Sequence, residues 1–384
     1  MKICIFNNEP IETAGGAGTA SFSIAKELAK SGEDVHYIVK SLGEYHEYEN
    51  SGVSIYCTRS SSYRKIPIIP ITIHRFLIYS FQSIIESQQL INKIKPDVFL
   101  SFGPYPSIHQ FVYNLTHKKS IPYIISFRHN PLLRKTPFIP KNAKWTWKFN
   151  PLIRHATAFT SPSYRLSKDV EPHIRRKINT IPNGIDSAIY YPNDTVNIDD
   201  KLSHPIILCL SRLAPEKRVE DAILAMPKIL EKYPQIILHI VGDGIEREKL
   251  TALVEKLNIS KSVEFIGHIS HDKVTDQYHA ASIFLLPSDD EGFPNTFLEA
   301  ITCGLPVVTT PVGDLEKIVP DARNGILINF QSPDEIADAI CTICSDKEQY
   351  RLYSKKSLEL SKNYSWCRVG KEYQQLFYDI CKYK

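Results

Sequence analysis

The stretch of sequence with the clearest chemistry holds two glutamates, Glu291 and Glu299. It follows an apolar, strand-like run, ASIFLLP, and leads into a helix that Pro294 can open and Gly304 can close. The amides of a first helical turn attract an anion, and a carboxylate accepts hydrogen bonds from adjacent hydroxyls. We therefore expect a phosphate site between two hydroxyl-binding acids; an ordinary exposed pair of glutamates is the alternative. The candidate residues are Glu291, Gly292, Phe293, Pro294, Asn295, Thr296 and Glu299.

A second polar loop, SRLAPEK, follows the apolar run HPIILCL. It carries two cations, Arg212 and Lys217, across an expected turn from strand to helix. Arginine is a planar fork and lysine a compact point charge, and both bind phosphate. We expect the two side chains to converge on one diphosphate; two solvated surface cations are the alternative. The apolar spacing predicts that the following helix runs from Lys217 to Tyr233.

A glycine-rich loop, GGAG at residues 15–18, follows the first apolar run, KICIFN, and precedes a helix predicted over 20–31. Glycines let the backbone approach an anion at a helix N-terminus, so Gly15 and Gly16 are candidates for phosphate binding; a tight turn alone is the alternative. The loop lacks the G-x-G-x-x-G pattern, and Lys40 rather than an acid ends the second strand. A nicotinamide dinucleotide is therefore not expected.

The elements that must position these loops alternate between strand-like and helix-like segments, and the alternation restarts after residue 185. Such alternation predicts parallel sheets covered by crossover helices, in two doubly wound α/β domains over 1–185 and 186–365. The polar stretch 183–203 is interpreted as a linker. Ligands of open parallel sheets bind beyond the carboxyl ends of the strands. The three loops therefore lie where a site in an interdomain cleft is expected.

Composition sets the broad class of protein. The 384 residues are 43% hydrophobic and 23% charged, which argues against a disordered chain, a collagen-like repeat or a disulfide scaffold. The eight cysteines show no paired pattern; Cys341 and Cys344 form a CxxC on a predicted helix, without partners for zinc. The start of the chain lacks the pattern of a secretory signal, and prolines and charges interrupt the apolar stretch 66–85. These features favour a cytoplasmic protein.

Charge is distributed unevenly along the chain. Residues 1–185 hold 24 Lys and Arg against 12 Asp and Glu, whereas the whole chain has a net charge of +4. The excess is concentrated between Arg128 and Lys177, where Trp145 and Trp147 are interleaved with basic residues. A leaflet of anionic lipids attracts such a surface, and tryptophan favours the headgroup level. An anionic membrane surface is therefore an expected partner, with a solvated basic face as the alternative; nucleic acid is not, because no recognition motif is present.

Taken in order, these motifs resemble the retaining glycosyltransferases of family four with the GT-B fold, also called glycosyl transferases group one. The resemblance rests on the E-x7-E pair, the SRLAPEK loop, the GGAG loop, and shorter matches at 96–98, 181–186 and 242–244. It covers nearly the whole chain. Three positions depart from the family pattern: Ser211 and Arg218 replace glycines, and Asn130 replaces an acid or a glycine.

The resemblance implies transfer of a hexosyl unit from a nucleoside diphosphate sugar to an acceptor hydroxyl, with retention. No D-x-D metal motif is evident, so we expect the reaction to need no metal or other cofactor. The basic, aromatic first domain suggests that the acceptor is a glycan, lipid-linked or otherwise membrane-borne, as in surface polysaccharide assembly, which would place the protein peripherally on the inner face of the membrane. A GT-B nucleotide-sugar epimerase and a non-catalytic nucleotide-sugar-binding protein remain alternatives.

The resemblance also assigns roles to residues. It implies that His129 contacts the donor sugar, that Gly16 lines its phosphate, and that the helix at 366–383 packs back onto the first domain. Gly242 and Gly267 are expected near the nucleotide base. The remaining implied roles are the diphosphate for Arg212 and Lys217, the transferred sugar for Glu291, and the ribose for Glu299.

Overall fold

The computed structural model describes residues 1–7, 16–41, 45–59, 84–104, 106–118, 120–128, 150–193 and 197–382. The predicted site residues Gly15 and His129 and most of the apolar stretch 66–85 lie outside these ranges. The chain divides into two compact units, Met1–Asn183 with Trp366–Lys384, and Gly184–Ser365. The sequence had suggested a boundary at 185/186.

The first unit is built on an eight-stranded sheet in the order β3-β4-β2-β1-β5-β6-β7-β8. Neighbouring strands are parallel except for the edge strand β3, which is antiparallel to β4. The strands are β1 (Lys2–Asn7), β2 (Asp34–Ser41), β3 (His46–Asn50), β4 (Val53–Arg59), β5 (Val98–Phe102), β6 (Tyr123–Ser126), β7 (Ala158–Ser161) and β8 (Asn179–Thr180).

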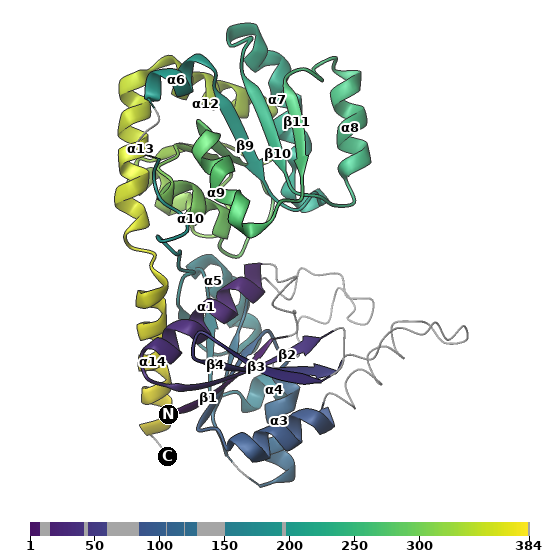
Figure 1. Ribbon diagram of the computed structural model, residues 1–384, viewed down its shortest axis with the longest axis vertical. Coiled ribbons are helices and arrows are strands. Elements are labelled where there is room, and N and C mark those ends of the chain that lie inside the picture. The colour runs from purple at the N-terminus through teal and green to yellow at the C-terminus, as the bar shows by residue number, and fades with distance from the viewer. Residues whose placement is uncertain are drawn as a thin grey trace, which may run out of the picture. The chain divides into compact units, whose positions relative to one another are not determined.

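Helices cover both faces of this sheet (Figure 1). Because side chains alternate along a strand, Ile3 and Ile5 of β1 face one core and Cys4 and Phe6 face another. The first core includes helices α1 (Gly16–Lys30) and α14 (Trp366–Lys382), and the second includes the helix at 84–94, α3 (Ile108–Thr116), α4 (Pro151–His155) and α5 (Tyr164–Ile174). Continuous apolar strands are typical of a sheet buried on both faces.

Helix α1 begins earlier than predicted. It starts at Gly16 rather than near residue 20, so Gly16, Ala17 and Gly18 form its first turn instead of a loop. Glycine disfavours a helix interior by only about 1 kcal/mol, and packing of the buried face of α1 outweighs that cost. Gly32, with φ of +87°, follows the helix end, where glycine adopts a left-handed conformation without strain.

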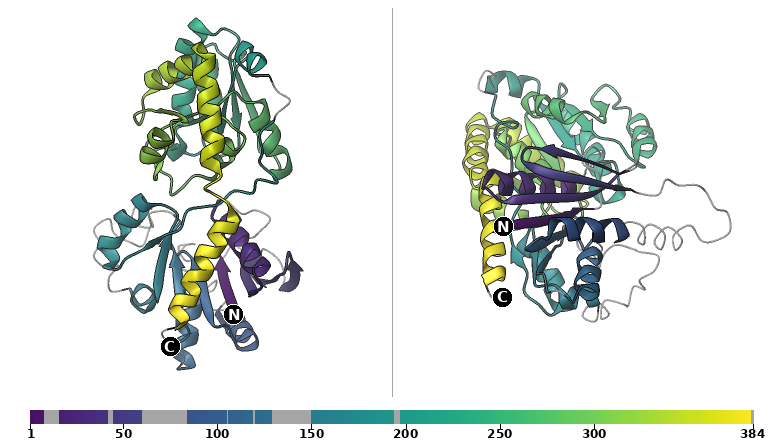
Figure 2. Two further views of the ribbon diagram at one scale, coloured as in Figure 1. Left: turned by 90° about the vertical axis from the view of Figure 1, so that its left-hand side faces the viewer. Right: turned by 60° about the horizontal axis from the view of Figure 1, so that its bottom comes forward.

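The C-terminal helix α14 packs against α1 in the first unit (Figure 2). Gly370 permits the close approach, because a Cβ there would lie 2.7 Å from Cβ of Glu27. The Glu33 carboxylate accepts hydrogen bonds from Gln374 at 2.6 Å and Tyr378 at 2.7 Å. The last helix of the chain is therefore part of the first unit.

The second unit has a six-stranded parallel sheet in the order β11-β10-β9-β12-β13-β14. This is the Rossmann order 3-2-1-4-5-6, and the strand order reverses between β9 and β12. Ligands of such sheets bind beyond the carboxyl ends of the strands at that reversal. The strands are β9 (Ile206–Leu210), β10 (Ile237–Val241), β11 (Val263–Gly267), β12 (Ile283–Leu286), β13 (Val307–Thr309) and β14 (Gly325–Leu327).

Two apolar cores sandwich this second sheet. Ile207 and Cys209 of β9 face the core of α7 (Val219–Lys232), α8 (Arg247–Lys256) and α12 (Pro333–Ser345). Leu208 faces the core of α9 (His271–Ala280), α10 (Asn295–Thr302) and α11 (Leu315–Ala322). Helix α13 (Lys347–Ser361) packs along α10 and α12.

The stretch 183–203 is not a simple linker. Ile185 forms a parallel bridge with Ser365, and helix α6 (Ile198–Ser203) packs against α13. The interpretation as a linker failed because α6 is only six residues long, too short for an apolar period to show.

Across the described residues we find no helix that is both long enough and apolar enough to span a membrane.

Candidate functional site

Two loops meet at the strand-order reversal of the second unit. One follows β9 and the other follows β12, so both leave the carboxyl edge of the sheet. The Asp289 amide donates to the Glu216 carbonyl at 2.9 Å, and Lys217 Nζ lies 2.5 Å from Glu291 Oε1. Arg218 Nε lies 4.0 Å from Asp289 Oδ2. Three consecutive residues of the first loop thus contact two residues of the second.

The Lys217–Glu291 ion pair is the centre of this arrangement. The two side chains are only 15% and 16% exposed, so the pair is largely removed from water. Ser288 Oγ donates a further hydrogen bond to Glu291 Oε1 at 3.1 Å. An ammonium group held in this way can donate to a phosphate, and the carboxylate can accept from sugar hydroxyls. The structure therefore brings together two of the residues that the sequence singled out.

Arg212 lies differently from the expectation. Its guanidinium pairs with Glu216 at 2.7 Å and is 66% exposed. The convergence of Arg212 and Lys217 on one diphosphate stays a prediction. An exposed ion pair contributes at most about 1 kcal/mol, so an anion of higher charge can draw the guanidinium away from Glu216 at little cost.

Arg218 interrupts the helix that was predicted to start at Lys217. Pro215–Lys217 form a 3-10 turn, Arg218 takes a left-handed conformation with φ of +51°, and α7 begins at Val219. A glycine adopts this conformation without strain, whereas in a residue with a Cβ atom the conformation is strained by about 1–2 kcal/mol. The backbone thus explains why the resembling family has glycine at this position, and the apolar spacing of α7 contained no signal for it.

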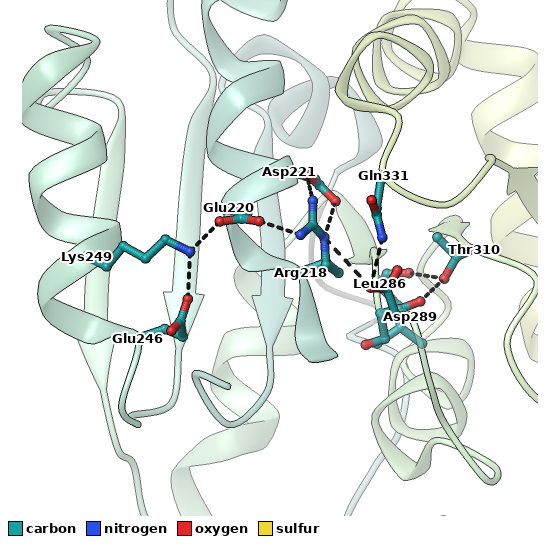
Figure 3. Close-up of polar contacts among 10 residues, drawn as sticks. Arg218, Glu220, Asp221, Glu246, Lys249, Leu286, Asp289, Thr310 and Gln331 are labelled. Atoms are coloured by element: carbon teal, nitrogen blue, oxygen red, sulfur yellow. Dashed lines mark hydrogen bonds and ion pairs between the residues drawn. The ribbon is translucent and has the colours of Figure 1, made fainter. Parts of the chain in front are cut away.

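The Arg218 side chain makes a network that compensates for its backbone (Figure 3). Nε and Nη2 donate to the two carboxylate oxygens of Asp221 at 2.9 and 2.7 Å, and Nη1 lies 2.5 Å from Glu220. Lys249 donates to the other oxygen of Glu220 at 2.7 Å. The ion pairs raise the pKa of Arg218 and keep the guanidinium charged. The network fixes the turn that carries Lys217.

The loop after β12 is fixed from a second side. Gln331 Nε2 donates to Asp289 Oδ2 at 3.2 Å (Figure 3). Thr310 Oγ1 donates to the Ser288 carbonyl at 2.5 Å. Gly313 has φ of +55°, and a Cβ there would lie 2.8 Å from the Gly292 carbonyl oxygen. The loop that carries Glu291 is therefore held by side-chain and backbone contacts before any ligand binds.

The start of α10 lies next in this loop. Pro294 is extended, with ψ of 121°, and serves as the N-cap rather than occupying the first turn as expected, because α10 begins at Asn295. Phe293 is buried against the Tyr364 ring at 5.6 Å. Thr296 belongs to the first helical turn together with Asn295. The amides of this turn point toward the loop end of the helix, where an anion is favoured.

Glu299 lies one turn further along α10 and interacts with two tyrosines. The hydroxyl of Tyr278, on α9, donates to Glu299 Oε2 at 2.6 Å. Burial first, and then the charge of Glu299, raise the pKa of Tyr278 and of Tyr190. Both phenols therefore stay protonated and act as donors. Sequence reasoning missed both tyrosines, because neither belongs to a motif.

The glycines expected near a nucleotide base form close backbone contacts. Gly242 has φ of +124°, and a Cβ there would lie 2.0 Å from the Ser211 carbonyl oxygen. Its amide donates to the Gly267 carbonyl at 2.8 Å, and Gly267 has φ of +80°. Beside them Arg247 stacks over the Phe265 ring at 4.8 Å, a contact that the sequence did not suggest. The strand ends after β9, β10 and β11 are therefore tightly joined.

In the first unit, Gly16 opens helix α1. Arg128 directly precedes His129 and hydrogen-bonds the Asn183 side chain. Its guanidinium lies over the Phe102 ring at 5.4 Å. Burial lowers the pKa of Arg128, although Tyr373 partly opposes the shift. The roles assigned to Gly16 and to His129 stay predictions.

Family models match both units of the chain. The model described as Glycosyl transferases group 1 matches residues 195–359, and the model described as Glycosyltransferase Family 4 matches residues 14–188. An uncharacterized glycosyltransferase of Methanocaldococcus jannaschii is 27% identical over 392 residues, which covers 97% of this chain and 96% of that protein.

Solved structures share the fold. A sucrose-phosphate synthase from Thermosynechococcus elongatus superposes with a TM-score of 0.81 at 20% identity and covers all of both chains. Anabaena HepE in complex with UDP-glucose superposes with a TM-score of 0.76 at 16% identity, covering 99% of this chain and all of that one. The expectation of two Rossmann-like domains in a GT-B fold is confirmed, and the chain belongs to the group 1 glycosyltransferase family.

Proposed function

We propose that the protein transfers a hexosyl unit from a nucleoside diphosphate sugar to an acceptor hydroxyl, with retention at the anomeric carbon. The observation that carries this proposal is the Lys217–Glu291 pair at the strand-order reversal of the second unit. It places a phosphate-binding cation beside a hydroxyl-binding acid, next to the first turn of α10. The UDP-glucose complex of the similar HepE protein supports a donor of this class.

In the proposed mechanism the leaving diphosphate gains negative charge as the glycosidic bond breaks. Lys217, Arg212 and the first amides of α10 stabilise that charge. Glu291 accepts hydrogen bonds from the transferred sugar, and Glu299 accepts them from the ribose. The departing phosphate oxygen takes the proton of the acceptor hydroxyl on the same face. Loss of one preorganised group of this kind lowers kcat by about 10²- to 10³-fold.

The proposal requires no metal ion, because Lys217 and Arg212 supply the positive charge that a bound cation would otherwise provide. Turnover should therefore be unchanged after dialysis against EDTA. A loss of activity that Mg²⁺ or Mn²⁺ restores would contradict this part of the proposal.

A thermal-shift panel of nucleoside diphosphate sugars tests the donor site. A ligand present at 100 times its Kd should stabilise the protein by about 2.7 kcal/mol. With the donor that stabilises the protein most, Glu291→Gln should lower kcat by about 10²-fold. Glu255→Gln, which changes an exposed residue of α8, should leave kcat unchanged. NMR of the product with an α-linked donor should show an α linkage.

Three results would count against the proposal. One is the absence of stabilisation by any donor, and another is a product of inverted configuration. The third is an epimerised nucleotide sugar that forms without acceptor, which would favour the epimerase alternative.

We further propose that the acceptor is a lipid-linked glycan in surface polysaccharide or lipopolysaccharide assembly, and that the protein docks peripherally on the cytoplasmic leaflet. Exposed basic residues on α5 and the turn after it support this proposal, and the exposed Tyr164 lies among them. Arg176 is less available, because it donates to the Ala156 and Thr157 carbonyls. The other described basic residues of this surface are Arg165, Lys168, Arg175 and Lys177.

Flotation with liposomes tests the docking surface. Wild-type protein should bind vesicles that contain anionic lipid at low salt and be released at high salt. Arg165→Glu with Lys168→Glu should weaken binding, whereas the matched pair Lys232→Glu with Lys256→Glu on the second unit should not. Binding that is equal at both salt concentrations would contradict electrostatic docking.

A further inference from the structure

The carboxylate of Glu299 is held by side chains from outside its own helix. Tyr278, on α9, is fully buried and donates to Oε2 at 2.6 Å. Tyr190, which is 3% exposed, contributes a second phenol, whose pKa is raised by burial and then by the charge of Glu299. The two rings meet edge to face with centroids 6.0 Å apart, and Tyr278 also packs against Phe284 at 6.1 Å. Neither ring can turn without disturbing the core around it.

We propose that Tyr278, assisted by Tyr190, is a positioning residue that fixes the Glu299 carboxylate for two adjacent hydroxyls of the donor's ribose. This inference rests on the proposed function. It adds that the two tyrosines, by fixing Glu299, determine how strongly the site prefers a nucleotide that carries both ribose hydroxyls. No motif of the sequence contains either tyrosine.

The chemistry of the carboxylate supports this assignment. A carboxylate offers about four lone-pair sites, so two phenol donors leave sites for a diol. A glutamate side chain loses about 1.5–2 kcal/mol of rotamer entropy when it is ordered. The two tyrosines order the Glu299 side chain when the protein folds, so this entropy is not lost again when the donor binds. Because both phenols stay protonated, they are available as donors, and a hydrogen bond from a phenol to a charged carboxylate is short and strong.

A purely structural role for Tyr278 would give a different result. Removing its hydroxyl would then destabilise the protein and weaken every ligand of the site equally. A positioning role affects only ligands that carry the ribose hydroxyls. Pairs of ligands with and without those hydroxyls therefore separate the two roles.

The test measures binding by calorimetry with UDP and GDP and with their 2′,3′-dideoxy analogues. Wild-type protein should prefer UDP or GDP over the matching dideoxy compound. Tyr278→Phe keeps the ring and should lose about tenfold in affinity for the ribonucleotide, the size of one hydrogen bond to a charged group, but nothing for the dideoxy analogue. Tyr190→Phe should act in the same direction. In turnover, the donor KM should rise while kcat changes little.

Tyr350→Phe is the matched control, because Tyr350 is a buried tyrosine of the same unit that donates to the Ser282 carbonyl at 2.9 Å. It should leave both affinities unchanged. Equal losses for ribose and dideoxy ligands in Tyr278→Phe, or no loss for either, would overturn the inference. If Tyr278→Phe does not fold, the same two outcomes in Tyr190→Phe overturn it.

Failure of the proposed function gives a different pattern. Wild-type protein that binds neither nucleotide refutes the donor site itself and the inference with it. Wild-type protein that binds the ribose and dideoxy forms equally leaves the donor site standing, but refutes the role of Glu299 at the ribose and the inference that depends on it. Wild-type protein that discriminates, together with a Tyr278→Phe variant that discriminates equally well, refutes the inference alone.

Discussion

Replacing Arg218 with glycine should destabilise the second unit, although glycine suits the backbone there. Glycine relieves the strain of a left-handed residue, which stabilises the folded state by about 1–2 kcal/mol. The larger conformational entropy of glycine in the unfolded chain destabilises the protein by about 0.5–1 kcal/mol. It also leaves Asp221, whose side chain is 2% exposed, without its bidentate partner. Removing one member of a buried pair costs about 3–5 kcal/mol, and the 21% exposure of Arg218 places this case at the lower end. The net loss is about 2 kcal/mol.

The assay must follow the correct unit. All three tryptophans, Trp145, Trp147 and Trp366, lie outside residues 184–365, so their fluorescence does not report on the second unit. Calorimetry and circular dichroism do. For a unit of this size, a loss of about 2 kcal/mol lowers Tm by about 4–8 °C.

A second variant tests whether the unpaired Asp221 carboxylate causes the loss of stability. Asp221→Asn combined with Arg218→Gly removes the unpaired carboxylate and should restore stability to within about 1 kcal/mol of the wild type. An Arg218→Gly variant that is as stable as the wild type would show that backbone strain, not the ion-pair network, governs this turn. A double variant as unstable as the single one would show that the loss does not arise from Asp221.

Two further changes have defined outcomes. Burial lowers the pKa of Lys201 to about 8, and its ammonium donates to the Ala281 carbonyl at 2.8 Å. Because the unfolded chain binds this proton more tightly, stability should rise with pH between about 8 and 10.5. Lys201→Met should be more stable at pH 7 by about 1–2 kcal/mol and should lack that rise in denaturant titrations, and a wild-type protein with no rise would contradict the assignment. Gly242→Ala should cost about 2 kcal/mol or more and weaken donor binding, because its Cβ would meet the Ser211 carbonyl. The control Gly32→Ala, at φ of +87° with open space around it, should cost about 1 kcal/mol and leave donor binding intact.

Much of the fold could be predicted because the signals are local. Each strand of the second sheet is a short apolar run, and each helix of its two layers has an apolar stripe. The errors fell where a local signal was weak. The start of α7 was misplaced because a single left-handed residue, Arg218, does not alter apolar spacing, and α6 was missed because six residues are too few to show a period.

The sequence by itself determined the types of element, the family, and the loops in which acids, cations and glycines gather. Only the tertiary structure decided which of these residues meet. Lys217 and Glu291 are far apart in the chain and become neighbours because β9 and β12 pair side by side where the strand order reverses. Tyr278 reaches Glu299 because α9 and α10 pack on one face of the sheet. Apolar spacing depends on residues a few positions apart, whereas these contacts depend on the order in which whole strands assemble, and no short window of sequence carries that order.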